Sequence, residues 1–338
     1  MSTSRYIESH LHLDGPGDRR PTALQIIEDE ALEGKLGGKV FVVTGVSSGI
    51  GIETVRALAT TNATVYGLVR DLKKGEQALA SILCPGRVEL LHCDLASLES
   101  VRSCAAQLLK KPNNKLNVLI ANAGVMAIQT RTTTVDGFEA QFGSNHLGHF
   151  LLFQLLKPTL LASSTSNFQS RVVALTSSGH RRYGVNFDNL NFDAPDSYTP
   201  FDAYAQSKTA NIYMANYIER HYGNRGLHGL TVHPGGIWTN LGIHLPISVT
   251  QAFQSDTRLQ NTFKSPEQGA ATSVLAAIGK EFEGKGRIYI EDCGEWGPFE
   301  GGTHNPAYRG YASHAFDEEA EDQLWKISCE LVDVYDDD

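Results

Sequence analysis

The stretch Lys39-Val-Phe-Val-Val-Thr44 runs directly into Gly45-Val46-Ser47-Ser48-Gly49-Ile50-Gly51 and then into Ile52-Glu-Thr-Val-Arg-Ala-Leu-Ala59. The first segment has the continuous apolar pattern of a buried strand, and the last has the pattern of a helix. Glycines let the backbone approach a ligand closely, and the free N–H groups of a helix N-terminus favour an anion. This order predicts a phosphate-binding pocket made by Gly45, Ser47, Ser48, Gly49, Ile50 and Gly51.

The alternation of strand and helix continues along the chain. Strand patterns recur at 63–69, 87–92, 116–120, 171–176 and 230–233, with helical patterns between them. Such alternation is typical of a parallel sheet that has right-handed crossovers and helices on both faces. We therefore expect an α/β fold, a doubly wound and mostly parallel sheet of the Rossmann type, in a single domain. In such sheets the ligand binds beyond the carboxyl ends of the strands.

The two ends of the chain are expected to extend this domain. Residues 1–37 are interpreted as an N-terminal extension with a short helix at 22–32, in which Leu24, Ile27 and Leu32 could face a core. Residues 38–338 form the sheet domain, with 241–266 on the substrate side and 290–338 as a C-terminal extension. The first 21 residues read as a mobile or surface-draped arm. His10 and His12 lack acidic or cysteine partners nearby, so a solvated tail is favoured and no metal is expected.

Composition excludes several classes of protein. The 338 residues include 29 Lys and Arg against 38 Asp and Glu, with a net charge of -9 and a mean hydropathy of -0.23. No basic run accompanies this charge, which argues against a nucleic-acid partner or anionic lipid. Five scattered cysteines indicate free thiols in a reducing compartment. With no secretory signal and no membrane span, a cytoplasmic enzyme or binding protein is expected.

One pair of residues suggests proton chemistry. Tyr204 and Lys208 are four residues apart in a helical stretch, so both side chains lie on one face. A nearby cation favours the phenolate, which would allow Tyr204 to exchange a proton near neutral pH. On spacing alone the pair is more often an ordinary surface feature, so its meaning depends on the residues around it.

Polar and small residues follow the predicted strand ends. Arg70 comes directly after the second strand, where an enzyme specific for NAD would place an acidic residue. An arginine there suits a 2′-phosphate and favours NADP(H), although a plain surface arginine is the alternative. Ala121-Asn122-Ala123-Gly124 follows the fourth strand, and its small residues would let a ribose lie close to the backbone. Ser177 and Ser178 follow the fifth strand, and Pro234-Gly235 follows the sixth.

Six motifs therefore occur in order over about residues 38–240: Thr44-Gly45-x-x-x-Gly49-x-Gly51, Asn122-Ala123-Gly124, Asn145, Ser178, Tyr204-x-x-x-Lys208 and Pro234-Gly235. With them the chain resembles the short-chain dehydrogenase/reductase family. Segments 144–150 and 171–180 are similar to its retinol-dehydrogenase-like and WW-domain-oxidoreductase-like branch. Segments 268–271 and 284–293 resemble fungal reductases, many of them from secondary-metabolite pathways.

The resemblance implies a role for each catalytic residue. Tyr204 would donate a proton to a carbonyl oxygen while NADPH delivers hydride to the carbon. Lys208 would lower the pKa of Tyr204 and bind the nicotinamide ribose. Ser178, preferred to Ser177 by counting from the strand, would hydrogen-bond the substrate oxygen. Asn145 would hold a water that links Lys208 to solvent.

The resemblance also implies the cofactor contacts. Asp94 would contact the adenine, and Ile237 and Thr239 the nicotinamide carboxamide or the pyrophosphate. The remaining cofactor-binding positions are Leu95, Asn122, Ala123, Gly124, Pro234 and Gly235, beside the glycine loop, Arg70, Tyr204 and Lys208.

Substrate contacts are less defined. Trp238, His180 and Tyr183 are candidates, each with a structural role as the alternative. The insert 181–203 either shapes the pocket or lies on the surface. The oligomeric state stays open: the resemblance implies a homodimer through the helices near 138–161 and 201–222 as one possibility, and terminal segments that cover these faces are the alternative.

The expected function is that of an NADP(H)-dependent oxidoreductase acting on a ketone, an aldehyde or the matching alcohol of a small organic substrate, with secondary metabolites as one class. Two alternatives stay open. The first is a C=C or C=N reductase or an epimerase on the same scaffold, and the second is a non-catalytic NADP(H)-binding module.

Overall fold

The computed structural model describes residues 4–112, 114–299 and 309–335. Within these residues eight strands form one sheet in the order β3-β2-β1-β4-β5-β6-β7-β8. Every neighbouring pair is parallel except β7 and β8, which are antiparallel. This confirms the expected fold class. The strands are β1 (Val40–Thr44), β2 (Thr64–Val69), β3 (Val88–His92), β4 (Val118–Ala121), β5 (Ser170–Leu175), β6 (Leu227–His233), β7 (Ile288–Glu291) and β8 (Gly294–Trp296).

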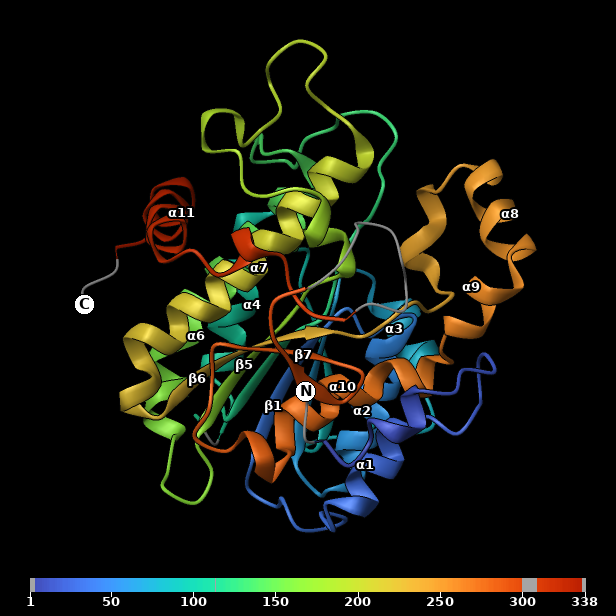
Figure 1. Ribbon diagram of the computed structural model, residues 1–338. Helices are drawn as coiled ribbons and strands as arrows, with labels where there is room; N and C mark the ends of the chain where they lie inside the picture. The colour runs from blue at the N-terminus through green and yellow to red at the C-terminus, as the bar shows by residue number, and fades with distance from the viewer. Residues whose placement is uncertain (1–3, 113, 300–308, 336–338) are drawn as a thin grey trace.

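Helices cover both faces of the sheet because successive side chains of a buried strand point to opposite sides. Phe41 and Val43 of β1 pack into one core, and Val40 and Val42 into the other. The first core is covered by α1 (Ala23–Asp29), α2 (Ile50–Thr60) and α10 (Pro266–Ile278). The second is covered by α4 (Leu98–Leu109), α6 (Gly148–Ser163) and α7 (Pro200–Tyr222). Figure 1 shows the two sets of helices on either side of the strands.

The strand order reverses between β1 and β4. From β1 the chain passes to β2 and β3 on one side, and from β4 to β5 and β6 on the other. Loops that leave neighbouring strands in opposite directions open a crevice at the carboxyl edge, which is where ligands bind in such sheets. The glycine turn after β1 and the segment Asn122–Gly124 after β4 both lie at this point.

Several elements differ from the sequence expectation. The single long helix expected near 138–161 is divided into α5 (Ala140–Phe142), a π-helical turn (Gly143–Leu147) and α6. In α1, Leu24 is 40% exposed, whereas Ile26 and Ile27 are buried. The expected core role of Leu24 is therefore wrong, because the helix turns its Ile26–Ile27 face towards the first core. α3 (Leu72–Leu79) begins at an N-cap, since the Asp71 side chain accepts the N–H of Lys74.

The substrate-side stretch 241–266 contains α8 (Ile247–Ser255) and α9 (Thr257–Thr262), which sequence patterns did not indicate. α10, β7 and β8 were also not predicted. Each is short or weakly periodic and is stabilised by partners distant in the chain. Within the described residues, no helix is both long and apolar enough to cross a membrane.

The C-terminal extension contains the helix α11 (Glu318–Leu331), which packs on α6 and α7. The Trp325 ring stacks on Tyr217 at 3.8 Å between centroids and meets Phe150 edge-on at 4.9 Å. His146 Nε2 lies 2.9 Å from the Ser328 hydroxyl. A homodimer through this face of α6 and α7 would require α11 to be displaced. Residues 300–308 and 336–338 of the expected extension lie outside the described residues.

Within the described residues the N-terminal arm is held against the domain, as in the surface-draped alternative, and the solvated tail expected around His10 is not found. His10 and Arg20 are each only 3% exposed. Burial lowers the pKa of His10 to about 4, so the imidazole is neutral at physiological pH. Figure 1 shows the arm in dark blue beside α9 and α10, and backbone Gly15 N–H donates to Asn261 O at 3.2 Å.

Candidate active site

The glycine turn after β1 is pressed against two neighbouring loops. Gly45 has a φ of +74°, and a Cβ there would lie 2.8 Å from the Cα of Ala123. A Cβ at Gly49 would lie 3.0 Å from Thr239 Cγ2, and one at Gly51 would overlap the Gly45 carbonyl oxygen. Only glycine fits these positions. The turn therefore brings the N-terminus of α2 close to the segments after β4 and β6, as the phosphate-pocket prediction requires.

The Thr44 hydroxyl joins three of these segments. Thr44 Oγ1 accepts the backbone N–H groups of Asn122 and Ala123, both at 2.9 Å, and lies 2.8 Å from His149 Nε2. The two N–H groups use both lone pairs of the hydroxyl, so its proton is donated to His149 Nε2. His149 Nδ1–H then donates to Asn145 O at 2.8 Å. The sequence favours a packed or surface position for His149, and the structure shows it packed. Its spacing of four residues from Asn145 was the available signal for the bond to Asn145 O.

Asn145 lies in the π-helical turn, a distortion that often marks a functional site. Its Oδ1 accepts the Val125 N–H at 2.8 Å, and its Nδ2 donates to the Ser207 hydroxyl at 2.9 Å. A Cβ on Gly124 would lie 3.4 Å from both Asn145 Oδ1 and Lys208 Nζ. The structure thus brings Asn145, Gly124 and Lys208 together as predicted.

Tyr204 and Lys208 lie on α7 with 5% and 4% of their surface exposed. Lys208 Nζ is 5.7 Å from the centre of the Tyr204 ring and donates to Leu175 O at 3.1 Å. Burial raises the pKa of Tyr204 to about 12 and lowers the pKa of Lys208 to about 8. The expected lowering of the Tyr204 pKa by Lys208 is therefore not found. Loss of hydration is the main cause of both shifts.

The serine beside Tyr204 is Ser177, not Ser178. The Ser177 side chain lies beside Tyr204 and lowers the pKa of its phenol, which partly offsets the effect of burial. A Cβ on Gly179 would lie 3.4 Å from both Ser177 Oγ and Tyr204 Cδ1, whereas Ser178 is exposed at the start of a 3₁₀ turn. The expectation for Ser178 is corrected for a structural reason. β5 ends at Leu175, one residue before the strand end assumed in the count.

Comparison with known proteins agrees with this geometry. The model of the family described as short chain dehydrogenase matches residues 39–189. A short-chain dehydrogenase/reductase, prx1, of the fungus Penicillium roqueforti is 51% identical over 98% of this chain and 95% of its own length. The chain belongs to the short-chain dehydrogenase/reductase family. It is therefore placed among oxidoreductases that use a nicotinamide cofactor.

Two further relatives support the branch and the fold. Retinol dehydrogenase 12 of Mus musculus is 34% identical over 88% of this chain and 87% of its own. This relative bears out the resemblance to retinol dehydrogenases. A solved structure of a putative uncharacterized protein from Mycobacterium paratuberculosis superposes with a TM-score of 0.68. It is 31% identical over 90% of this chain and 97% of its own.

The residues present fit a dinucleotide. Asn122 Nδ2 donates to Thr44 O at 2.8 Å, while its buried Oδ1 has no hydrogen-bond partner among the described residues. Arg70 is exposed at the carboxyl end of β2. Asp94 Oδ1 accepts the Ala96 N–H at 3.0 Å, which fixes the turn that also contains Leu95. The site therefore offers an unpaired acceptor on Asn122, the glycine turn after β1 and the Arg70 cation at the edge of the crevice. These are the groups that a dinucleotide needs.

Two hydrophobic positions of the predicted cofactor set support the loops from behind. A Cβ on Gly269 of α10 would lie 2.7 Å from Ile237 Cγ1 and 2.8 Å from Ile50 Cγ2. Both isoleucines therefore pack on α10. Their contribution to the pocket is to fix the backbone of the turns after β1 and β6.

The three expected substrate contacts have different surroundings. His180 is fully buried, with its Nδ1 2.6 Å from Ser177 O and its Nε2 accepting the Ala312 N–H at 3.1 Å. Burial lowers its pKa to about 3. His180 is thus a structural residue, and its expected substrate role is wrong because both ring nitrogens are already bonded. Trp238 stacks on Phe263 at 4.6 Å, and Tyr183 is half-buried, so their substrate roles stay predictions.

The insert 181–203 packs on the segment that follows β4. Tyr198 Oη donates to Ile128 O at 2.6 Å, and the Glu139 N–H donates to Asn191 Oδ1 at 2.6 Å. Figure 1 shows these loops gathered at the top of the molecule.

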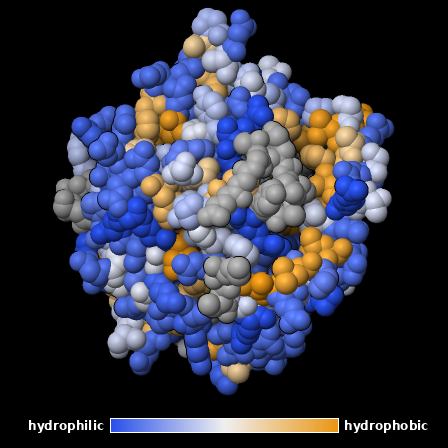
Figure 2. Space-filling model, viewed as in Figure 1, coloured by the Kyte–Doolittle hydropathy of each residue, from blue (hydrophilic) through white to orange (hydrophobic). Residues whose placement is uncertain are grey.

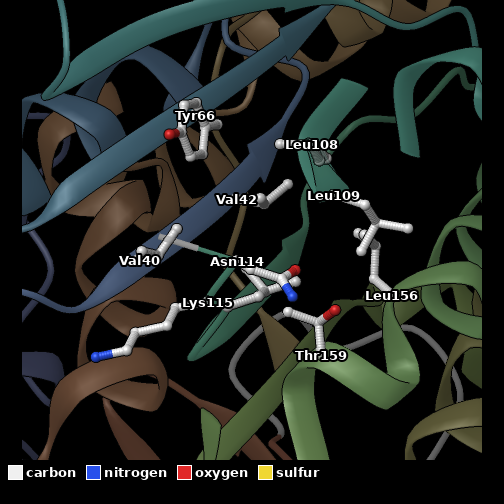
Figure 3. Close-up of a pocket in the computed structure, with 10 residues that line it drawn as sticks. Val40, Val42, Tyr66, Leu108, Leu109, Asn114, Lys115, Leu156 and Thr159 are labelled. Atoms are coloured by element: carbon white, nitrogen blue, oxygen red, sulfur yellow. The ribbon is translucent and has the colours of Figure 1, made fainter. Parts of the chain in front are cut away.

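The carboxyl edge also carries apolar surface. Leu241 Cδ1 lies 3.8 Å from the Cβ position of Gly124, and the nearby Ile243 and Ile247 are 74% and 76% exposed. Figure 2 shows hydrophobic residues gathered around α8 and α9. The pocket in Figure 3 lies elsewhere, where Val40 begins β1, and is lined by Tyr66, Leu116 and Leu156. Its volume of about 10 Å³ leaves room for little more than one water molecule, so it is not the active site.

The adjacent serines provide a matched test of the site. We expect Ser177→Ala to lower kcat by about 10²–10³-fold, because it removes a donor to the oxygen on which charge develops. Ser178→Ala should change kcat by less than about threefold, since that side chain is exposed. Steady-state kinetics on both purified variants measure this. A large loss in Ser178→Ala with a normal Ser177→Ala would restore the original assignment.

The buried Lys208 gives a pH-dependent prediction. Its pKa lies at about 8 in the folded chain against an ordinary value of 10.5, so below pH 8 the folded state holds a desolvated ammonium. Lys208→Met should therefore stabilise the cofactor-free protein at pH 7 by about 1–3 kcal/mol. Between pH 8 and 10.5 the folded wild type releases a proton that the unfolded chain keeps, so the wild type gains stability.

Urea unfolding at pH 7 and pH 9.5 measures the difference. The advantage of Lys208→Met should shrink at the higher pH. Lys326→Met, on the exposed side of α11, should show no such trend. An advantage that stays constant over the pH range would contradict the buried-ammonium explanation.

Proposed function

We propose that the protein is an NADP(H)-dependent oxidoreductase that reduces a ketone or aldehyde, or oxidises the matching alcohol, of a small organic substrate. The observation that carries this proposal is that the Ser177 side chain lies beside the buried Tyr204, whose helix also places the buried Lys208. Two hydroxyl groups that lie side by side can both donate a hydrogen bond to a single substrate oxygen. A pure binding module has no need of this pair.

The chain's residues would divide the work as follows. The cofactor, when bound, supplies or accepts a hydride. Ser177 Oγ holds the substrate oxygen, and Tyr204 Oη transfers its proton to that oxygen. A Tyr204 pKa of about 12 keeps the phenol protonated at neutral pH, which suits a proton donor in the reducing direction. Lys208 Nζ stabilises the phenolate left behind and returns a proton through the region of Asn145.

The preference for NADP(H) is supported by Arg70. β2 ends at Val69 without an acidic residue, and the exposed guanidinium that follows can pair with a 2′-phosphate. The apolar surface near Leu241, Ile243 and Ile247 supports a substrate with hydrophobic character. The relationship to fungal reductases supports a secondary metabolite as that substrate, and a cytoplasmic location fits the free cysteines.

Turnover tests the proposal directly. The purified protein should oxidise NADPH in the presence of some members of a panel of apolar ketones and aldehydes. Tyr204→Phe should lower kcat by about 10³-fold or more while the Kd for NADPH changes by less than about twofold. Tyr217→Phe, on the same helix but under α11, is the matched control and should keep full activity. Tight NADPH binding without turnover of any carbonyl compound would count against the proposal.

Cofactor choice is tested at Arg70. Arg70→Ala should raise KM for NADPH by about 10-fold or more and leave KM for NADH nearly unchanged, because only the 2′-phosphate contact is lost. Lys73→Ala, another exposed cation nearby, should alter neither value. Equal effects on the two cofactors would show that Arg70 does not read the 2′-phosphate.

A further inference from the structure

The loop after β6 is held from behind by a buried ion pair. The Lys264 side chain is 2% exposed, and its Nζ lies 2.7 Å from Asp292 Oδ1. Nζ also donates to Pro234 O at 3.0 Å, while the backbone N–H of Lys264 donates to Gly236 O at 2.8 Å. One residue thus bonds to two carbonyl groups of the four-residue segment 234–237.

The shape of the loop is fitted to this lysine. Gly235 has a φ of +100°, and a Cβ there would lie 3.0–3.1 Å from Cε, Cδ and Nζ of Lys264. Hence a side chain at Gly235 would both strain the backbone and push the ammonium away. The loop and Lys264 hold each other in a single arrangement.

Asp292 also interacts with residues from the N-terminal and the C-terminal parts of the chain. It lies in the turn between β7 and β8, and its Oδ2 accepts from Arg309 Nε at 2.5 Å. His10 Nε2 lies 3.7 Å from Oδ1, and Arg309 also donates to His10 O at 2.8 Å. The N-terminal arm therefore reaches the same carboxylate as Lys264.

The arm also holds the segment that leads into Lys264. Arg20 donates to Gly15 O at 3.0 Å, to Thr262 O at 2.8 Å and to Phe263 O at 2.5 Å. Gln268 Nε2 in turn donates to backbone oxygens of the arm at 2.9 and 3.1 Å. These bonds hold residues 262 and 263, directly before Lys264, against the arm.

A buried ion pair is weak evidence for stability, since desolvation of both charges opposes its formation. Its clearest use is to fix one geometry. The geometry fixed here is that of the Pro234–Ile237 backbone, at the edge of the cofactor crevice and far along the sheet from Arg70 at the end of β2.

We propose that the N-terminal arm and the Lys264–Asp292 pair form a clamp that positions loop 234–237 for the nicotinamide half of the cofactor. Lys264 and Arg20 are positioning residues that act through this loop. The inference rests on the proposed cofactor site, and it assigns a role in cofactor binding to residues that do not touch the cofactor.

Binding of a cofactor fragment distinguishes this positioning role from a general loss of stability. NADPH spans the whole crevice, whereas 2′,5′-ADP contains only the adenine half. Arg20→Ala and Lys264→Met should each weaken NADPH binding by about 10-fold or more and change 2′,5′-ADP binding by less than about twofold. Isothermal titration gives both dissociation constants. If the wild type binds NADH instead, NADH and ADP form the equivalent pair.

Arg19→Ala is the matched control, because Arg19 is the exposed neighbour of Arg20, and it should change neither constant. If Lys264→Met does not fold, as judged by circular dichroism, the Arg20 variant decides the question alone. Equal weakening of NADPH and 2′,5′-ADP, or no weakening of either, would overturn the clamp. A wild type that binds neither dinucleotide would refute the proposed function itself and the clamp with it.

Discussion

The Thr44 hydroxyl is the atom group on which the rest of the site depends. It accepts two N–H groups from the loop after β4 and donates to His149, which donates to the Asn145 carbonyl. All of its hydrogen-bonding capacity is used, and it is buried. A shift of any partner would leave a buried polar group unpaired, at a cost of about 1–3 kcal/mol. Strand β1, the loop after β4 and the π-helical turn are therefore fixed relative to one another.

Burial also decides the electrostatics of the catalytic pair. Tyr204 resists losing its proton and Lys208 resists keeping one, because each charged form would be desolvated. In the proposed reaction, proton transfer to the substrate creates a phenolate near the ammonium. The two charges then stabilise each other where water is scarce and the effective dielectric constant is low. The ammonium therefore opposes the desolvation cost of the phenolate, but the raised pKa of Tyr204 shows that burial still favours the neutral phenol.

The sequence alone was sufficient to predict those elements whose determining contacts are local. Strand β1, the glycine turn and α2 follow from periodicity, and the Tyr204–Lys208 pair follows from helical spacing. The choice between Ser177 and Ser178 depended on where β5 ends, which is set by pairing of Leu175 with Val232 in β6. The buried arm was unpredictable for the same reason. Arg20 finds its acceptors more than 240 residues later, at Thr262 and Phe263.

The turn between β7 and β8 shows how such distant contacts shape local sequence. Asp292 and Cys293 both have positive φ values, 52° and 55°, as a two-residue hairpin requires. Asn-Gly or Gly-Gly would adopt this conformation at a free-energy cost that is lower by about 1 kcal/mol per residue. Neither glycine nor asparagine could supply the carboxylate that Lys264 and Arg309 share. The strained turn is tolerated because its aspartate joins both ends of the chain to the loop that borders the cofactor crevice.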